Sequence, residues 1–353
     1  MDLQERIESF SELGRFINEY LTCPDCQQKD QLLSLEGAIR KAEEENPWFT
    51  RTNILFALAE IARTLDKEYL EHWLSSYPER DLNPGTSKSV GVIMAGNIPL
   101  VGFHDFISVL ISGNIFIGKN SQRDKVLLKT LAEILTRINP GFSSRLGFTD
   151  GILPACDGFI ATGSNNSQRY FDYYFGKWPH IFRKHRNGAA ALSGTETPGQ
   201  LEQLSDDIFL FFGLGCRNVA KIFIPSGWDF TPLFSAMTKY SFVADHHKYA
   251  NNYTYYKAAL QMNKIPHIDT GFLLLRQDPS ISSPTAMLYY DWYDTRDDLN
   301  RKLLVHKDNL QCIVSGMTLA HQAVPFGSSQ KPDLWEYADD VDTLKFLFNL
   351  CKN

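Results

Sequence analysis

The stretch from residue 89 to about residue 164 constrains the fold of this chain more than any other feature. Short apolar runs begin at Ser89, Asn114 and Gly158, and each has the length and composition of a buried strand. Segments with helical spacing of apolar residues separate them, over 103–112 and 125–138. Strands that alternate with helices are typical of a parallel sheet whose site lies at the carboxyl ends of the strands. The sequence therefore predicts an α/β fold.

The remainder of the chain indicates a second lobe and a helical beginning. Residues 1 to about 80 carry apolar side chains at helical spacing, such as Ile7, Phe10 and Leu13. At 353 residues, the chain is longer than one typical hydrophobic core supports. We therefore expect two lobes, preceded by an α-helical N-terminal section.

Charge and composition argue against several classes of partner. The formal net charge is −6 and no long basic run occurs, so we expect no nucleic acid partner. No apolar run reaches spanning length, so we expect no membrane span. Scattered cysteines and a polar start without a secretory signal predict a cytoplasmic location. Cys23 and Cys26 form a C-x-x-C pair with no second pair at zinc spacing, so we expect no metal site.

Cys216 is the residue that most resembles a prepared nucleophile. It follows Gly213 and Gly215 and precedes Arg217 at the end of an apolar stretch. Glycine allows close approach of a substrate, and a turn into a helix at this point would direct free N–H groups at the sulfur and favour the thiolate. Buried, unreactive cysteines are common, so the run of residues 211–218 taken alone is equally consistent with an ordinary core cysteine.

Polar residues follow the predicted strands. Asn97 in Gly96-Asn97-Ile98-Pro99 offers an amide that could hold an oxyanion, or it is a turn residue that tolerates an unusual backbone angle. The second strand ends in polar residues that could bind a ribose and phosphate, or are simply solvated; they are Lys119, Ser121, Gln122 and Arg123. Gly163 and Ser164 offer backbone N–H groups for a pyrophosphate, although the G-x-G-x-x-G pattern is missing.

Taken in order, these segments resemble the aldehyde dehydrogenase superfamily. Residues 96–99, 112–114 and 119–122 are similar to its Asn-x-Pro turn, its A-G-N turn and its K-P-x-E strand end. Within the superfamily the chain most resembles the LuxC-type fatty acyl-CoA reductases, through residues 96–105 and 213–219. The resemblance covers roughly residues 80 to 330. It implies an aldehyde dehydrogenase-like fold with two lobes, each a mostly parallel sheet flanked by helices.

The resemblance also implies roles for particular residues. Cys216 matches the catalytic thiol that carries the acyl group as a thioester, and Asn97 matches the amide that holds the oxyanion together with the Cys216 N–H. Lys119 matches the lysine that contacts the adenosine ribose, and Gly163 and Ser164 match the turn beside the pyrophosphate. The expected domains are a helical section plus nicotinamide cofactor-binding domain over 1–190, a catalytic thiol domain over 191–325, and a C-terminal segment over 326–353 that packs back on the body.

Two departures from the wider superfamily refine this expectation. The best match to the L-E-L-G-G segment of hydrolytic members places Ala191 at the glutamate that activates water, with Glu196 as a possible replacement. This favours reduction of the thioester to a fatty aldehyde over its hydrolysis. Gln122 and Arg123 replace a negative charge beside the ribose with a neutral and a positive side chain, which favours NADPH as the cofactor.

The predicted function is therefore that of an NADPH-dependent acyl-CoA reductase. Two alternatives remain open: acyl transfer through Cys216 without a nicotinamide, and a non-catalytic scaffold that binds a partner. We expect acyl-CoA as substrate, an acyl-donating synthetase or transferase as a possible partner, and a homo-oligomer. His104 and Asp105 could position substrate or cofactor, or form a polar pair at a helix start. The turn Pro325–Gly327 faintly resembles a P-F-G turn of the superfamily.

Overall fold

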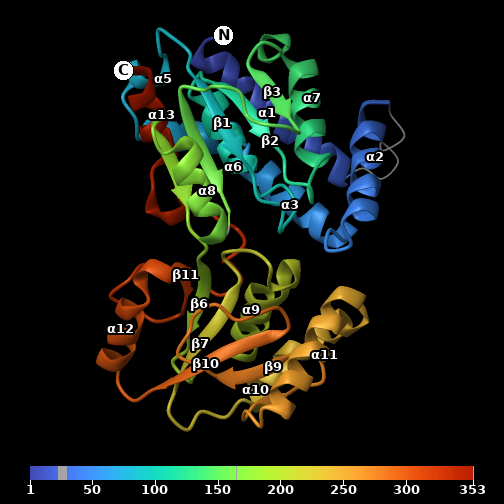
Figure 1. The fold of residues 1–353 in the computed structure, drawn as a ribbon, viewed down its shortest axis with the longest axis vertical. Helices are drawn as coiled ribbons and strands as arrows, with labels where there is room; N and C mark the ends of the chain where they lie inside the picture. Colours follow the sequence, from blue (N-terminus) through green and yellow to red (C-terminus); the bar gives the residue numbers. More distant parts are fainter. Residues whose placement is uncertain (23–29, 164, 353) are drawn as a thin grey trace. The chain divides into compact units, whose positions relative to one another are not determined.

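The chain folds into two compact units. The computed structural model describes residues 1–22, 30–163 and 165–352. The first unit comprises residues 1–184 and 333–353, and the second comprises residues 185–332 (Figure 1).

The first unit begins with the predicted helical section. Its helices are α1 (Leu3–Thr22), α2 (Asp30–Glu45), α3 (Arg51–Thr64), α4 (Lys67–Ser75), α5 (Glu79–Leu82), α6 (Phe103–Ile111), α7 (Leu127–Ile138), α8 (Asn165–Phe175) and α13 (Thr343–Lys352). Local chemistry sets several of their starts. Thr50 accepts a hydrogen bond from the N–H of Asn53 at the start of α3, and Asp66 accepts one from Glu68 at the start of α4.

A five-stranded parallel sheet forms the centre of the first unit. Its strands are β1 (Ser89–Ile93), β2 (Ile115–Lys119), β3 (Leu146–Thr149), β4 (Gly158–Thr162) and β5 (His180–Arg183), in the order β3-β2-β1-β4-β5. The chain moves outward from β1 to β2 and β3 and then returns to the other side of β1 for β4 and β5. A ligand of an open parallel sheet binds at such a reversal, outside the carboxyl ends of the strands. The predicted alternation over residues 89–164 is thereby confirmed.

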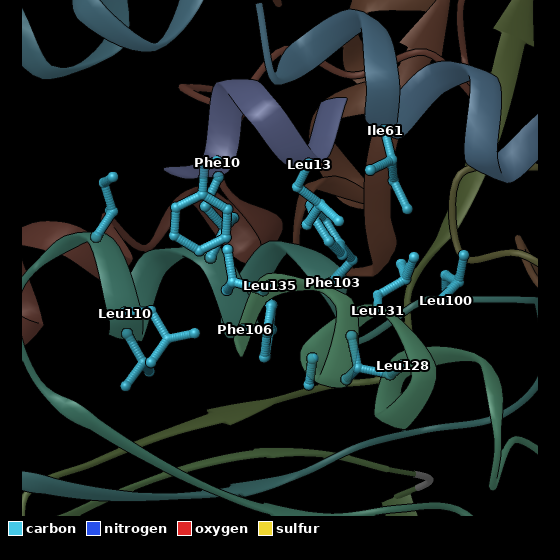
Figure 2. Close-up of a cluster of buried hydrophobic side chains, with 14 of the residues drawn as sticks. Phe10, Leu13, Ile61, Leu100, Phe103, Phe106, Leu110, Leu128, Leu131 and Leu135 are labelled. Carbon is cyan, nitrogen blue, oxygen red and sulfur yellow. The ribbon is translucent and has the colours of Figure 1, made fainter. Parts of the chain in front are cut away.

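Successive side chains along each strand point to opposite faces of this sheet. Val90, Val92 and Phe116 belong to the large apolar core that the sheet shares with α1, α6 and α7. Figure 2 shows Phe10 and Leu13 of α1 above side chains of α6 and α7 in this core. The opposite side carries a smaller cluster around Phe159, whose ring lies 4.4 Å from that of Phe175 in α8. The sheet therefore has a large apolar core on one face and a smaller apolar cluster on the other.

The C-terminal segment returns to the first unit through buried polar contacts. The Arg183 guanidinium donates to both carboxylate oxygens of Asp105 at 2.6 Å and to the hydroxyl of Thr343. His104 bonds through Nε2 to the carbonyl oxygen of Leu334 at 2.9 Å, and burial lowers the pKa of its imidazole. Breaking one partner of such a buried ion pair typically costs about 3–5 kcal/mol. His104 and Asp105 therefore anchor the returning segment, and their side chains are engaged in that role.

The second unit also contains a mostly parallel sheet flanked by helices. Its strands are β6 (Asn187–Ala191), β7 (Val219–Pro225), β8 (Ile268–Asp269), β9 (Leu274–Gln277), β10 (Met287–Tyr293) and β11 (Leu310–Val314), in the order β11-β6-β7-β10-β9-β8. Its helices are α9 (Pro198–Phe209), α10 (Thr231–Met237), α11 (His247–Met262) and α12 (Arg296–Val305). β8 pairs antiparallel with β9, and the other pairs are parallel. In the part of the chain that the structure describes, no helix combines the length and hydrophobicity needed to cross a membrane.

Candidate active site

Asn97 lies in a turn directly after β1. The turn runs through residues 97–102 and contains Leu100 in the left-handed region, with φ 58°. The N–H of Leu100 donates to Oδ2 of Asp124 at 2.9 Å. The other carboxylate oxygen of Asp124 has no hydrogen-bond partner among the described residues, and burial raises the pKa of this carboxyl to about 6. Asp124 therefore holds the Asn97 turn in a strained conformation.

The residues after β2 pack against this turn. A side chain at Gly96 would place its Cβ 2.5 Å from Oγ of Ser121, so only glycine allows the two turns to approach this closely. Ser121 Oγ accepts a hydrogen bond from the N–H of Arg123 at 3.2 Å. The Gln122 and Arg123 side chains are exposed. Both residues follow Ser121, which packs against the residue before Asn97. This position is compatible with contact to a ligand at the carboxyl ends of the strands.

Gly163 lies at the end of β4, directly before α8. A Cβ at this position would come within 3.0 Å of Ser167 and of the Phe171 ring. Glycine thus lets α8 lie close to the end of β4. Ser164 lies outside the described residues, so its predicted role stays a prediction.

A cavity of about 590 Å³ lies on the α8 side of the sheet. Lys119 and Ile93 line it from the strand ends, and residues 152–155 line it from the loop after β3. The remaining wall is aromatic and comes mainly from α8 and its flanks: Phe159, Tyr170, Phe171, Tyr174, Phe175 and Trp178. Flat apolar walls with one cation at the rim suit a heterocyclic base with a polar substituent that reaches the cation.

Cys216 lies in the second unit, in the turn between α9 and β7. The turn leads into a strand, so the expected turn into a helix is wrong and no helix dipole acts on the sulfur from the following segment. The residue is half-buried.

The backbone before Cys216 follows an unusual path. Phe211, Phe212 and Gly213 adopt φ values of 53°, 57° and 74°, a run of left-handed residues. Each non-glycine residue in this region costs about 1–2 kcal/mol. Both phenylalanine rings are buried, and Phe212 packs against His246 with 4.4 Å between ring centres. Burial of the rings offsets the strain, and strain of this kind is typical of functional loops.

Hydrogen bonds from Asn218 fix the turn around Cys216. The N–H of Gly215 donates to Oδ1 of Asn218 at 2.7 Å, and the N–H of Asn218 donates to the carbonyl of Gly215 at 3.1 Å. Nδ2 of Asn218 donates to the carbonyls of Asp207 and Leu210. The side chain of Asn218 is 1 % exposed, so its amide is fully used inside the protein. The thiol loop is therefore a defined structure with little freedom.

Ala191 and Glu196 are the two residues considered for the water-activating position. Ala191 is fully buried in an apolar cluster with Phe223 and Leu299, so its side chain belongs to the core of the second unit. Glu196 accepts hydrogen bonds from the N–H groups of Ser193 and Gly194 in its own turn. Because strand β6 is buried on both faces, sequence matching could not show which way residue 191 points. Ala191 itself offers no carboxylate, and its match to the glutamate of hydrolytic members stays a prediction.

A second cavity of about 530 Å³ belongs to the second unit. Gln200 and Gln203 of α9 line it together with residues 315–319, 321–323 and Pro325–Phe326 after β11. The P-F-G turn forms one end, and its Gly327 has φ 77° and lies against Gln203. The cavity mixes amide, hydroxyl and apolar groups.

In the described residues, no group of three or more His, Cys, Asp or Glu side chains is arranged to hold a metal ion. Cys23 and Cys26 lie outside the described residues.

Comparison with known proteins shows the fold. No family model matches the sequence, and no curated protein matches it either. Among solved structures, the chain is similar to the aldehyde dehydrogenase of Mycobacterium tuberculosis complexed with NAD+, with 14% identity, TM-score 0.62, and coverage of 90% of this chain and 74% of that one. It is also similar to a cysteine-to-alanine variant of aldehyde dehydrogenase C from Pseudomonas syringae with NAD+ and octanal (12% identity, TM-score 0.63, 89% and 72%). The aldehyde dehydrogenase from Bacillus cereus in complex with NAD+ is a third (13% identity, TM-score 0.62, 89% and 72%).

The predicted aldehyde dehydrogenase-like fold is thus confirmed. In the first unit, the structure brings most of the predicted residues to one edge of the sheet; they are Asn97, Lys119, Ser121, Gln122, Arg123 and Gly163. Cys216 belongs to the second unit, and its pairing with Asn97 stays a prediction. Sequence reasoning missed Asp124, Asp207 and the aromatic wall from α8. Asn218 lies within the motif of residues 213–219, but its role in holding the thiol loop was not predicted.

Proposed function

We propose that this protein is an NADPH-dependent acyl-CoA reductase that forms a thioester on Cys216 and releases a fatty aldehyde. The observation that carries the proposal is the half-buried Cys216 thiol on a strained, fully hydrogen-bonded loop, in a chain with the aldehyde dehydrogenase-like fold. A core cysteine needs no such loop, whereas a nucleophile gains from a fixed position.

The residues of the first unit fit a nicotinamide dinucleotide. The aromatic cavity would hold the adenine, and Lys119 at its rim would donate to the adjoining ribose. Gly163, which allows α8 to lie close to the end of β4, would bring the start of that helix to the pyrophosphate. When bound, the cofactor supplies hydride. The exposed Arg123 and the neutral Gln122 would favour a 2′-phosphate on the ribose, which supports NADPH over NADH.

The chain's own groups would carry out the covalent steps. The Cys216 thiolate attacks the carbonyl carbon of the acyl thioester, and the side-chain amide of Asn97 and the Cys216 N–H donate to the resulting oxyanion. The C–S bond to coenzyme A then breaks and the thiol leaves. The Cys216 thioester would accept the hydride that the cofactor supplies, and the resulting thiohemiacetal on Cys216 would collapse to free the aldehyde and the thiol.

The reductive direction is supported by the resemblance of residues 96–105 and 213–219 to LuxC-type acyl-CoA reductases. The acyl donor would be coenzyme A or a partner protein that carries the acyl group. We place the reaction in the cytoplasm, with the protein as a homo-oligomer.

The test mixes purified protein with NADPH and acyl-CoA thioesters of graded chain length, and follows cofactor oxidation and aldehyde formation. We expect both in the wild type and in Cys351→Ser, which changes a half-buried thiol of the first unit, and neither in Cys216→Ser. Absence of NADPH oxidation with every chain length would contradict the proposal. Thioester exchange on Cys216 without cofactor oxidation would instead indicate an acyltransferase.

A further inference from the structure

Asp207 joins α9 to the segment that follows the P-F-G turn. It lies near the end of α9 and is 1 % exposed. Its Oδ2 accepts a hydrogen bond from the N–H of Gly327 at 2.7 Å, and its Oδ1 accepts one from the N–H of Ser329 at 2.9 Å. Burial raises the pKa of this carboxyl, while the two N–H groups oppose the shift and nearby Asp206 adds to it. Both oxygens are therefore occupied as acceptors.

The same residue also contacts the loop that carries the thiol. Its backbone carbonyl accepts from Nδ2 of Asn218 at 3.0 Å, and Oδ1 of Asn218 accepts from the N–H of Gly215, the residue before Cys216. On the other side of the thiol, Nε of Arg217 donates to the carbonyl of Ser329 at 2.6 Å. The hydrogen bonds thus form a closed ring through α9, the thiol loop and residues 327–329.

We propose that Asp207 is a positioning residue that sets the orientation of Cys216 for attack on the acyl carbonyl, an inference that rests on the proposed function. Both of its oxygens are engaged by backbone N–H groups, so it is not available as a base. Its carboxylate acts through residues 327–329 and its backbone carbonyl acts through Asn218, so the Cys216 turn is held from its two sides. Residues 327–329 follow Pro325 and Phe326, which line the second cavity. The ring of hydrogen bonds therefore also fixes the position of this cavity wall relative to the thiol.

The central variant is Asp207→Asn, with Asp206→Asn as its matched control. An amide has one acceptor oxygen, so its NH₂ group would face a backbone N–H and one arm of the ring would open. Asp206 is the neighbouring carboxylate and pairs with Lys239 at 2.7 Å and with the hydroxyl of Tyr240. Both variants remove one negative charge at nearly the same place, so a difference between them reports the hydrogen bonds and not the charge.

Three measurements give the expected pattern in Asp207→Asn. The rate of Cys216 acylation by acyl-CoA, followed by mass spectrometry, falls about tenfold to a hundredfold because the thiol is misaligned. The KM for NADPH, whose proposed site is in the first unit, stays within about twofold. Alkylation of Cys216 by iodoacetamide, mapped to its peptide, rises roughly threefold or more, since the loop opens and this small reagent needs no alignment. Asp206→Asn stays close to wild type in all three.

Each departure from this pattern has a defined meaning. Equal acylation and equal alkylation in the two variants would overturn the inference. A parallel fall of acylation, alkylation and cofactor binding would show general unfolding and overturn a positioning role. If wild type reacts with no acyl-CoA, the proposed function fails, and unchanged alkylation in Asp207→Asn would then refute the hold on the loop separately. If Asp207→Asn does not fold, Arg217→Lys replaces it. This variant keeps the charge but lacks the Nε donor to Ser329, so slower acylation, faster alkylation and an unchanged KM for NADPH are expected there too.

Discussion

Asn218 and Gly215 are joined by a hydrogen bond of 2.7 Å from the Gly215 N–H to the Asn218 side chain, directly before Cys216. A Cβ at Gly215 would lie 2.8 Å from that same Oδ1 atom and 3.2 Å from Oε1 of Gln330. We therefore expect Gly215→Ala to destabilise the protein by about 1–3 kcal/mol and to reduce Cys216 acylation.

The matched control for this prediction is Gly199→Ala. Gly199 lies in the first turn of α9 with nothing within 4 Å of an added Cβ. This variant should be neutral or up to about 1 kcal/mol more stable, because alanine favours helix. Thermal unfolding measures both, and equal melting temperatures in the two variants would contradict the role assigned to Gly215.

Asn97→Ala should reduce turnover about a hundredfold, which corresponds to about 3 kcal/mol of lost oxyanion stabilisation. Asn97 is half-buried in a turn, so the melting temperature should change little. Steady-state kinetics with acyl-CoA measures the loss, and Asn263→Ala, which alters an exposed asparagine after α11, serves as control. Undiminished turnover in Asn97→Ala would remove this residue from the mechanism.

Gln122→Glu should shift the cofactor preference toward NADH. A carboxylate at this exposed position can accept from a ribose hydroxyl and repels a 2′-phosphate. A difference of about 1.4 kcal/mol, or tenfold in the ratio of kcat/KM for NADPH to that for NADH, is the expected scale. An unchanged ratio would show that residue 122 does not contact the ribose.

Asp124→Asn should stabilise the protein at neutral pH. The pKa of this carboxyl is about 6 in the folded state against 3.8 in the unfolded chain, because burial penalises its charge. The folded state therefore binds more protons between these values, so stability is highest below about pH 4 and falls as pH rises toward 6. The variant lacks this loss, and its gain over wild type is up to about 3 kcal/mol above pH 6.

Denaturant unfolding at a series of pH values tests the Asp124 prediction. The two proteins should converge at acid pH and separate as pH rises. A constant difference across the range would show that the Asp124 carboxyl is not the titrating group.

Local sequence patterns predicted the elements around Asn97 well, and they did so for a physical reason. Alternation of apolar runs with helical segments depends on neighbours in the chain, so β1, α6, β2, α7 and β4 could be placed from residues 89–164. The direction of a side chain on a strand buried on both faces has no such signal. Ala191, which the sequence matches to the glutamate of hydrolytic members, has its side chain in the core.

The contacts that hold the site were invisible for a different reason. Asp207 binds the N–H groups of Gly327 and Ser329, which are more than a hundred residues away along the chain. Asp124 similarly binds Leu100, across a helix and a strand. Every residue except proline carries a backbone N–H, whatever its side chain. No sequence motif therefore marks the residues that will bind a given carboxylate.

The sequence by itself determined the α/β fold, the carboxyl-edge position of Asn97, Lys119 and Gly163, and the choice of Cys216 as candidate nucleophile. These follow from periodicity and from residue chemistry at strand ends, which are local properties. Only the tertiary structure decided that Cys216 precedes a strand on a left-handed loop, that Asn218 and Asp207 hold that loop, and that aromatic residues of α8 wall a cavity beside Lys119. Those features depend on which distant backbone groups packing brings together, and burial and hydrogen-bond geometry settle that only in the folded chain.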